Sequence, residues 1–295
     1  MHASAANPAD PATGAANTRS VKPPMKRRWL FAVLALAFLF VLMPFLFWQA
    51  TWFGRPLDDT QLERSLADTE HPREIQHALS QIADRILAPD QARRDSARHF
   101  YPDVIRISET GGDELRITAA WLMGQDSSAP EFHRQLLVLL GDANPMVRRN
   151  AALALVRFHD ASGLDEIRAI LQPYSAPASR PGKLIERLKP SEVINPGALL
   201  GWVNTGGAKQ EMRSQVPGMI DHWLVADGAA VAAGQPVLQI NPSSAEVWEA
   251  LRALYLIGQA QDLPAVEQFV RGADDMPLDV RRQAEVTGDA IRARK

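Results

Sequence analysis

The residues of this chain that could carry out chemistry are few and scattered. There is no cysteine, so thiolate nucleophiles, disulfides and cysteine metal sites are excluded together. The seven histidines form no His-x-x-x-His pair or other compact ligand spacing, which argues against a metal site. No Gly-x-Ser-x-Gly elbow, phosphate loop or dinucleotide-binding glycine pattern occurs. We therefore expect no catalytic residues, no metal and no cofactor.

The charge of the chain is close to neutral. It has 32 lysines and arginines against 34 aspartates and glutamates, which gives a formal net charge of -2. No basic face is concentrated enough to release many phosphate counterions, so we expect no nucleic-acid partner. The chain is long enough to form one or two packed domains.

The clearest pattern is a strand-turn-strand unit that occurs twice between Pro181 and Asn241. Alternating apolar residues predict strands in both copies, and a turn from Asn204 to Ala208 separates them. A shift of 37 residues, as from Ile194 to Val231, superimposes the two copies. Glycines supply the positive φ that tight turns require, and those expected to be structural are Gly197, Gly206, Gly207, Gly218, Gly228 and Gly234.

The second copy carries the most specific signal in the chain. The segment from Arg213 to Ile220, followed by Asp227-Gly228 and by residues 234–238, resembles the barrel-sandwich domain of membrane fusion proteins and the biotinyl/lipoyl carrier fold. The resemblance implies a flattened antiparallel barrel over residues 176–243.

In lipoyl domains the modified lysine lies in the turn between the copies, and the residue aligned with it here is Gly207. The resemblance therefore implies an unmodified domain. Lys209 follows two positions later, so a biotinyl or lipoyl carrier modified on Lys209 stays open as an alternative. Fusion-protein adaptors place a long helical hairpin where this chain has only the short turn. An accessory periplasmic adaptor subunit of an efflux or secretion system stays open as well.

Helical patterns repeat on both sides of this β region. Leu115, Val147, Val247 and Val280 mark equivalent apolar positions. Their intervals of 32, 100 and 33 residues indicate stacked helical hairpins, with the β region inserted in the longest interval. The segment from Asp142 to Leu155 is the best match to the HEAT-repeat family, which the helical regions resemble. The resemblance implies HEAT-like repeats over 58–175 and 244–295, with a ladder that pairs Asp142 with Arg148 and Asp275 with Arg281.

Helical solenoids of this kind bind other proteins and seldom catalyse. The candidate contact residues are Arg149, Trp248 and Arg282, and Trp248 stands where other repeats have arginine. Trp121, in contrast, we expect to pack between repeats.

The N-terminal region changes character near Trp29. Residues 1–28 have a composition that predicts a disordered cytoplasmic tail, and the apolar segment over 29–50 predicts a transmembrane helix. The excess of basic residues before the segment predicts a cytoplasmic N-terminus and a periplasmic main body, anchored in a bacterial inner membrane.

The sequence thus predicts a mainly α protein with a single transmembrane helix, a HEAT-like solenoid and an inserted lipoyl-like all-β domain. The expected function is that of a non-catalytic, membrane-anchored scaffold or adaptor that binds other membrane or envelope proteins. A second copy of the chain, in a homo-oligomer, is a further expected partner.

Overall fold

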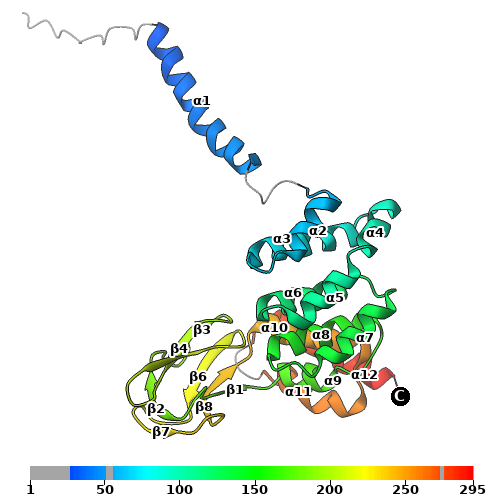
Figure 1. The fold of residues 1–295 in the computed structure, drawn as a ribbon. Helices are drawn as coiled ribbons and strands as arrows, with labels where there is room; N and C mark the ends of the chain where they lie inside the picture. Colours follow the sequence, from blue (N-terminus) through cyan, green and yellow to red (C-terminus); the bar gives the residue numbers. More distant parts are fainter. Residues whose placement is uncertain (1–26, 51–55, 273–275, 295) are drawn as a thin grey trace, which may run out of the picture. The chain divides into compact units, whose positions relative to one another are not determined.

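The computed structural model describes residues 27–50, 56–272 and 276–294, and it is mainly helical (Figure 1). The chain divides into two compact units, residues 1–55 and residues 56–295. The first contains helix α1 (Arg27–Ala50), and the second contains every other helix and strand described. Asp275 and nearly all of the predicted tail over 1–28 lie outside the described residues.

The predicted transmembrane helix over 29–50 is wrong. Within the described part of the chain, no helix combines the length and the apolar character that crossing a bilayer demands. A span needs about 20 consecutive apolar residues. The transmembrane part of the expected fold class is withdrawn, and the expected location outside the cytoplasm stays a prediction.

The second unit contains an array of antiparallel helices. Helices α6, α8, α10 and α12 pack one on the next, and α5, α7, α9 and α11 pack against them as partners. The predicted equivalent residues Leu115, Val147, Val247 and Val280 are all buried at these contacts. The helices of the array are α2 (Asp59–Ala67), α3 (Pro72–Ile86), α4 (Gln91–Arg98), α5 (Tyr101–Thr110), α6 (Asp113–Met123), α7 (Pro130–Leu139), α8 (Pro145–Arg157), α9 (Leu164–Ile170), α10 (Ser244–Ile257), α11 (Leu263–Val270) and α12 (Leu278–Ala293).

Local sequence explains where the two central helices begin. Asn144 caps α8 by accepting a hydrogen bond from the backbone N–H of Met146, and Pro145 occupies the first turn, where its missing N–H costs nothing. Ser243 and Glu246 form a capping box at the start of α10. Both helices therefore begin at fixed residues, and α8 and α9 contact α10 although the β domain separates them in sequence.

The β domain lies between α9 and α10 and consists of two antiparallel four-stranded sheets. One sheet has the order β1-β8-β6-β3 and the other the order β5-β4-β2-β7. The core between them is apolar, and Met146 of α8 packs against it. The strands are β1 (Tyr174–Pro177), β2 (Gly182–Glu186), β3 (Val193–Ile194), β4 (Leu199–Asn204), β5 (Lys209–Arg213), β6 (Gly218–Trp223), β7 (Ala230–Val231) and β8 (Pro236–Asn241).

The two sheets repeat each other strand by strand. In both, a long strand pairs with the next long strand of its own half and with the short strand of the other half: β2 with β4 and β7, and β6 with β8 and β3. Ile194 and Val231 occupy equivalent short strands. The pairing of β6 with β8 skips Asp221 between Ile220 and His222, and this bulge makes the second copy one residue longer.

Close backbone approaches also recur in both halves. A Cβ on Gly182 would lie 2.5 Å from the carbonyl oxygen of Asn204, and one on Gly218 would lie 2.3 Å from that of Asn241. Only glycine fits at these two strand starts. Gly182 carries the same constraint as Gly218, although the sequence alone marks only Gly218.

The turns of the two halves are equivalent too, with one substitution. Gly228 has φ +77° and donates its N–H to the carbonyl of Leu184. At the matching position Ser191 has φ +71° and donates to the carbonyl of Ile220. A serine therefore holds a left-handed conformation that glycine would adopt without strain.

Candidate functional site

A groove of about 480 Å³ runs along the helices α6, α8 and α10 of the array. A smaller hollow of about 250 Å³ between α10 and α12 shares Arg252 and Leu256 with it. The two hollows lie side by side on α10, and we call them together the α6–α12 groove. Its walls are helix side chains from Trp121, Gln125, Asn150, Leu153, Arg157, Glu249, Arg252, Tyr255, Leu256, Gln283 and Val286, among others.

Large apolar side chains are exposed along this groove. Trp121 of α6 is 46% exposed, Leu256 and Tyr255 of α10 are 57% and 42% exposed, and Val286 of α12 is 52% exposed. Leaving such side chains in water costs hydrophobic free energy, and contiguous exposed apolar surface commonly marks an interaction site. The groove is therefore the strongest candidate binding surface among the described residues.

Charged groups frame the apolar residues. The guanidinium carbon of Arg252 lies 4.6 Å from the centroid of the Trp248 ring, and Nη1 lies 3.8 Å from Oε1 of Glu249. Both members of this ion pair are more than half exposed. Arg157, also exposed, donates to the side-chain oxygen of Gln125 at 2.6 Å. The groove thus presents two guanidinium groups against one carboxylate.

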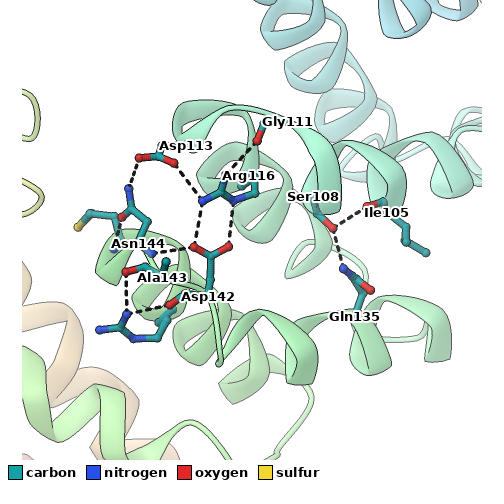
Figure 2. Close-up of polar contacts among 11 residues, drawn as sticks. Ile105, Ser108, Gly111, Asp113, Arg116, Gln135, Asp142, Ala143 and Asn144 are labelled. Carbon is teal, nitrogen blue, oxygen red and sulfur yellow. Dashed lines mark hydrogen bonds and ion pairs between the residues drawn. The ribbon is translucent and has the colours of Figure 1, made fainter. Parts of the chain in front are cut away.

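A polar network fixes α6 against the turn that precedes α8 (Figure 2). Arg116 donates two hydrogen bonds to the carboxylate of Asp142, from Nε at 2.9 Å and from Nη2 at 3.0 Å. The same guanidinium reaches Asp113 and the carbonyl of Gly111. Asn144 donates its side-chain amide to Asp113 and its backbone N–H to Asp142. These bonds join consecutive repeats, because α6 belongs to one repeat and the turn before α8 to the next.

The network shifts the ionisation of both partners. Burial alone would raise the pKa of Asp142, but hydrogen bonds from Arg116 and the backbone N–H of Asn144 outweigh it and lower the pKa. The hydrogen bond to Asp142 likewise raises the pKa of Arg116, since it stabilises the charged guanidinium. Both groups are charged at neutral pH.

Deeper in the same layers, Ser108 and Gln135 connect α5 to α7. The Gln135 amide donates to the Ser108 hydroxyl at 3.0 Å, and that hydroxyl donates to the carbonyl of Ile105 (Figure 2). Both side chains are buried. No buried side-chain nitrogen or oxygen in the described ranges lacks a hydrogen-bond partner, so the array leaves no unpaired buried polar side chain to explain.

The expected pairing of Asp142 with Arg148 takes a different form. Arg148 donates to the backbone carbonyls of Asp142 and Ala143, while its Nε binds Glu166 of α9 at 2.6 Å. The carboxylate of Asp142 is instead bound by Arg116 of the preceding repeat. In the second predicted pair, Asp275 lies outside the described residues, and Arg281 is exposed on α12.

Two ion pairs join the array across the β domain. Arg149, only 5% exposed, donates to Glu246 of α10 at 2.6 Å, so its guanidinium is used inside the protein and does not face a partner. Arg168 of α9 donates to Asp262 at 2.5 Å, and Asp262 is fully buried. The hydrogen bond to Asp262 raises the pKa of Arg168.

The other predicted contact residues lie at or near the surface. Trp248 is half-buried beneath Arg252, and Arg282 is exposed on α12. Lys209 is exposed at the start of β5, opposite Asn204 of β4. Its side chain emerges from a strand and not from the tip of the turn, where Gly206 and Gly207 are exposed with open space around them. A carrier role for Lys209 stays a prediction.

The predicted structural glycines fall into two groups. Gly197, Gly206, Gly228 and Gly234 have φ between +77° and +92°, which only glycine adopts without strain. Gly218 is required mainly because of the carbonyl of Asn241 that crowds it. Gly207 meets no such restriction.

Comparison with known proteins adds no functional assignment. No protein-family model matches the chain, and a search of curated proteins gives no match. Within the ranges the structure describes, no group of three histidine or carboxylate side chains is placed to hold a metal ion.

The residue that sequence analysis missed is Trp121. We expected it to pack between repeats, but it is 46% exposed and lines the groove. A signal for this was present, because Trp121, Leu153 and Val286 follow the buried residues Leu115, Val147 and Val280 at the same spacing. An apolar residue that recurs once per repeat beside the buried stripe indicates a second, exposed stripe.

Proposed function

We propose that this chain is a non-catalytic scaffold that binds other proteins, and that the α6–α12 groove is its principal binding surface. The single observation that carries the proposal is the set of exposed apolar side chains that line the groove, Trp121 of α6, Tyr255 and Leu256 of α10 and Val286 of α12. We further propose that the helical array is HEAT-like and that the β domain is an unmodified lipoyl-like module.

Two features of the groove support a binding role. Its wall is rigid, because Arg116, Asp142, Arg149 and Glu246 tie its helices together through buried or half-buried ion pairs. A rigid surface loses little conformational entropy when a partner binds. Aromatic and arginine side chains, which dominate the energy of many interfaces, are also concentrated here, with Trp121 and Arg252 as the main examples.

Photo-crosslinking in intact cells tests the proposal. Trp121 is replaced by p-benzoyl-phenylalanine in one variant, and Val138 of α7, which is 66% exposed on the partner-helix layer, is replaced in a matched control. We expect a discrete crosslinked protein from position 121 and none from position 138. Crosslinks of equal yield from both positions, or none from position 121, would overturn the groove as the binding surface.

A further inference from the structure

We propose that the occupant of the α6–α12 groove is an amphipathic α-helix of another protein, with an apolar stripe toward the groove and acidic residues on its flanks. The inference rests on the proposed function and names the class of partner. It follows from three properties of the groove: the type of its polar groups, the spacing of its apolar groups and the sign of its charge.

The walls of the groove offer few partners for a peptide backbone. Their own backbone groups belong to α6, α8, α10 and α12 and are bonded within those helices. Two of the side-chain amides are already engaged, Gln125 with Arg157 and Asn150 with the carbonyl of Met146. An extended segment would bury unpaired N–H and C=O groups here, which is costly. A helix satisfies its backbone internally and avoids this cost.

The apolar groups of the groove recur once per wall helix. Trp121 lies on α6, Leu153 on α8, Leu256 on α10 and Val286 on α12. Packed helices lie about 8–10 Å apart. A helix presents a side chain on the same face every seven residues, which is about 10.5 Å at its rise of 1.5 Å. A helix laid across the four wall helices therefore meets each apolar group with one residue of its stripe.

The charge of the groove favours acidic flanks. Arg157 and Arg252 are exposed at its rim, and Glu249 is the one carboxylate among the side chains that line it in the described ranges. Glu249 lies 3.8 Å from Arg252, in a solvent-exposed position where an ion pair is weak. Glutamate side chains on a bound helix would meet two guanidinium groups and gain charge-assisted hydrogen bonds.

A panel of synthetic peptides tests the inference on the full chain by fluorescence anisotropy. The first peptide is a 21-residue helix former with leucine at every third or fourth position and glutamate on both flanks. The second has the same composition in scrambled order, and the third has lysine in place of glutamate. We expect the first to bind at least tenfold more tightly than the second and at least fivefold more tightly than the third.

Protein variants then locate the binding. Trp121→Ala should weaken the first peptide at least fivefold, and Arg252→Glu should weaken it while strengthening the lysine peptide. Val138→Ala, on the partner-helix layer, should change neither. Circular dichroism of each variant verifies that the array is folded.

Equal binding of the ordered and scrambled peptides, no binding by any peptide, or indifference to Trp121→Ala and Arg252→Glu would overturn the inference. The scaffold proposal has its own test. If position 121 still crosslinks a cellular protein while the panel fails, the groove binds a partner that is not an acidic amphipathic helix. If the crosslinking fails as well, the proposed function fails with it.

Discussion

Ion pairs join the helices of the array at two kinds of place: before the β domain, between consecutive repeats, and across the β domain, between helices far apart in sequence. We call each of these contacts a junction. Before the β domain, Arg116 and Asp142 join consecutive repeats, with side chains that are 18% and 11% exposed. Across the β domain, Arg149 and Glu246 join α8 to α10 although they lie 97 residues apart in sequence. Arg168 and Asp262 join α9 to the start of α11 over 94 residues.

The pKa values of Asp142 and Glu246 are shifted in opposite directions. Asp142 gathers hydrogen bonds from Arg116 and from a backbone N–H, and these lower its pKa in spite of burial. At Glu246 burial dominates and raises the pKa, although Arg149 and Ser243 pull the other way. The difference shows that the pKa of a buried acidic partner depends on whether its hydrogen bonds outweigh its burial. They do so at Asp142, and they do not at Glu246.

The largest effect should follow the removal of Asp262. Asp262→Ala deletes the buried acceptor of Arg168 and of the backbone N–H of Gln259, so we expect a loss of about 3 kcal/mol of unfolding free energy. Urea denaturation followed by circular dichroism measures it. Asp165 offers a matched control, since it binds the same guanidinium but is 91% exposed.

Asp165→Ala should therefore cost no more than about 0.5 kcal/mol. Equal losses from Asp262→Ala and Asp165→Ala would mean that burial does not set the strength of the junction. That result would remove the distinction between buried and exposed partners of Arg168.

The junction before the β domain should show an intermediate effect. Asp142→Asn replaces a carboxylate that accepts two hydrogen bonds from Arg116 by a neutral amide, and we expect a loss of about 2 kcal/mol. Asp113→Asn is the control, because Asp113 binds Arg116 once and is 61% exposed. A loss from Asp142→Asn as small as that from Asp113→Asn would contradict the role of the forked contact.

Some of these contacts follow from sequence and others cannot. The period of Leu115, Val147, Val247 and Val280 predicts which helices share a layer, because apolar periodicity must be buried. The bond from Arg116 to the carboxylate of Asp142 was not predicted, since a ladder within one repeat and a bond to the preceding repeat leave the same sequence spacing. The bond from Arg149 to Glu246 could not be predicted, because it exists only once the β domain has brought its two ends together.

The β domain shows the same division between local and long-range information. The shift from Ile194 to Val231 reveals the internal repeat, because equivalent strands need equivalent apolar residues. The exchange of short strands between halves, β2 with β7 and β6 with β3, leaves no periodic trace in sequence. The exposure of Trp121 was missed for a related reason: an apolar residue on a helix has the same appearance whether a neighbour covers it or not.

The smallest effect, and the sharpest test of the comparison, concerns pH. The folded-state pKa of Asp142 lies below its ordinary value of 3.8, so its contribution is present above that pH and is lost as pH falls through the folded-state pKa. The folded-state pKa of Glu246 lies above its ordinary value of 4.5, so its contribution is present below 4.5 and is lost as pH rises through the folded-state pKa.

The two neutral variants should therefore diverge in opposite directions. Relative to the unmodified chain, Asp142→Asn should be less destabilising as pH falls below 3.8. Glu246→Gln should become relatively more stable as pH rises above 4.5, because the raised pKa of Glu246 makes its charged form progressively less favourable in the folded state. Urea denaturation of the unmodified chain and of both variants between about pH 3 and 7 measures the unfolding free energies. For each variant, the difference from the unmodified chain is plotted against pH, and its slope is read. Slopes of the same sign would mean that Arg149 compensates Glu246 as fully as Arg116 compensates Asp142, and the two junctions would then differ only in sequence separation.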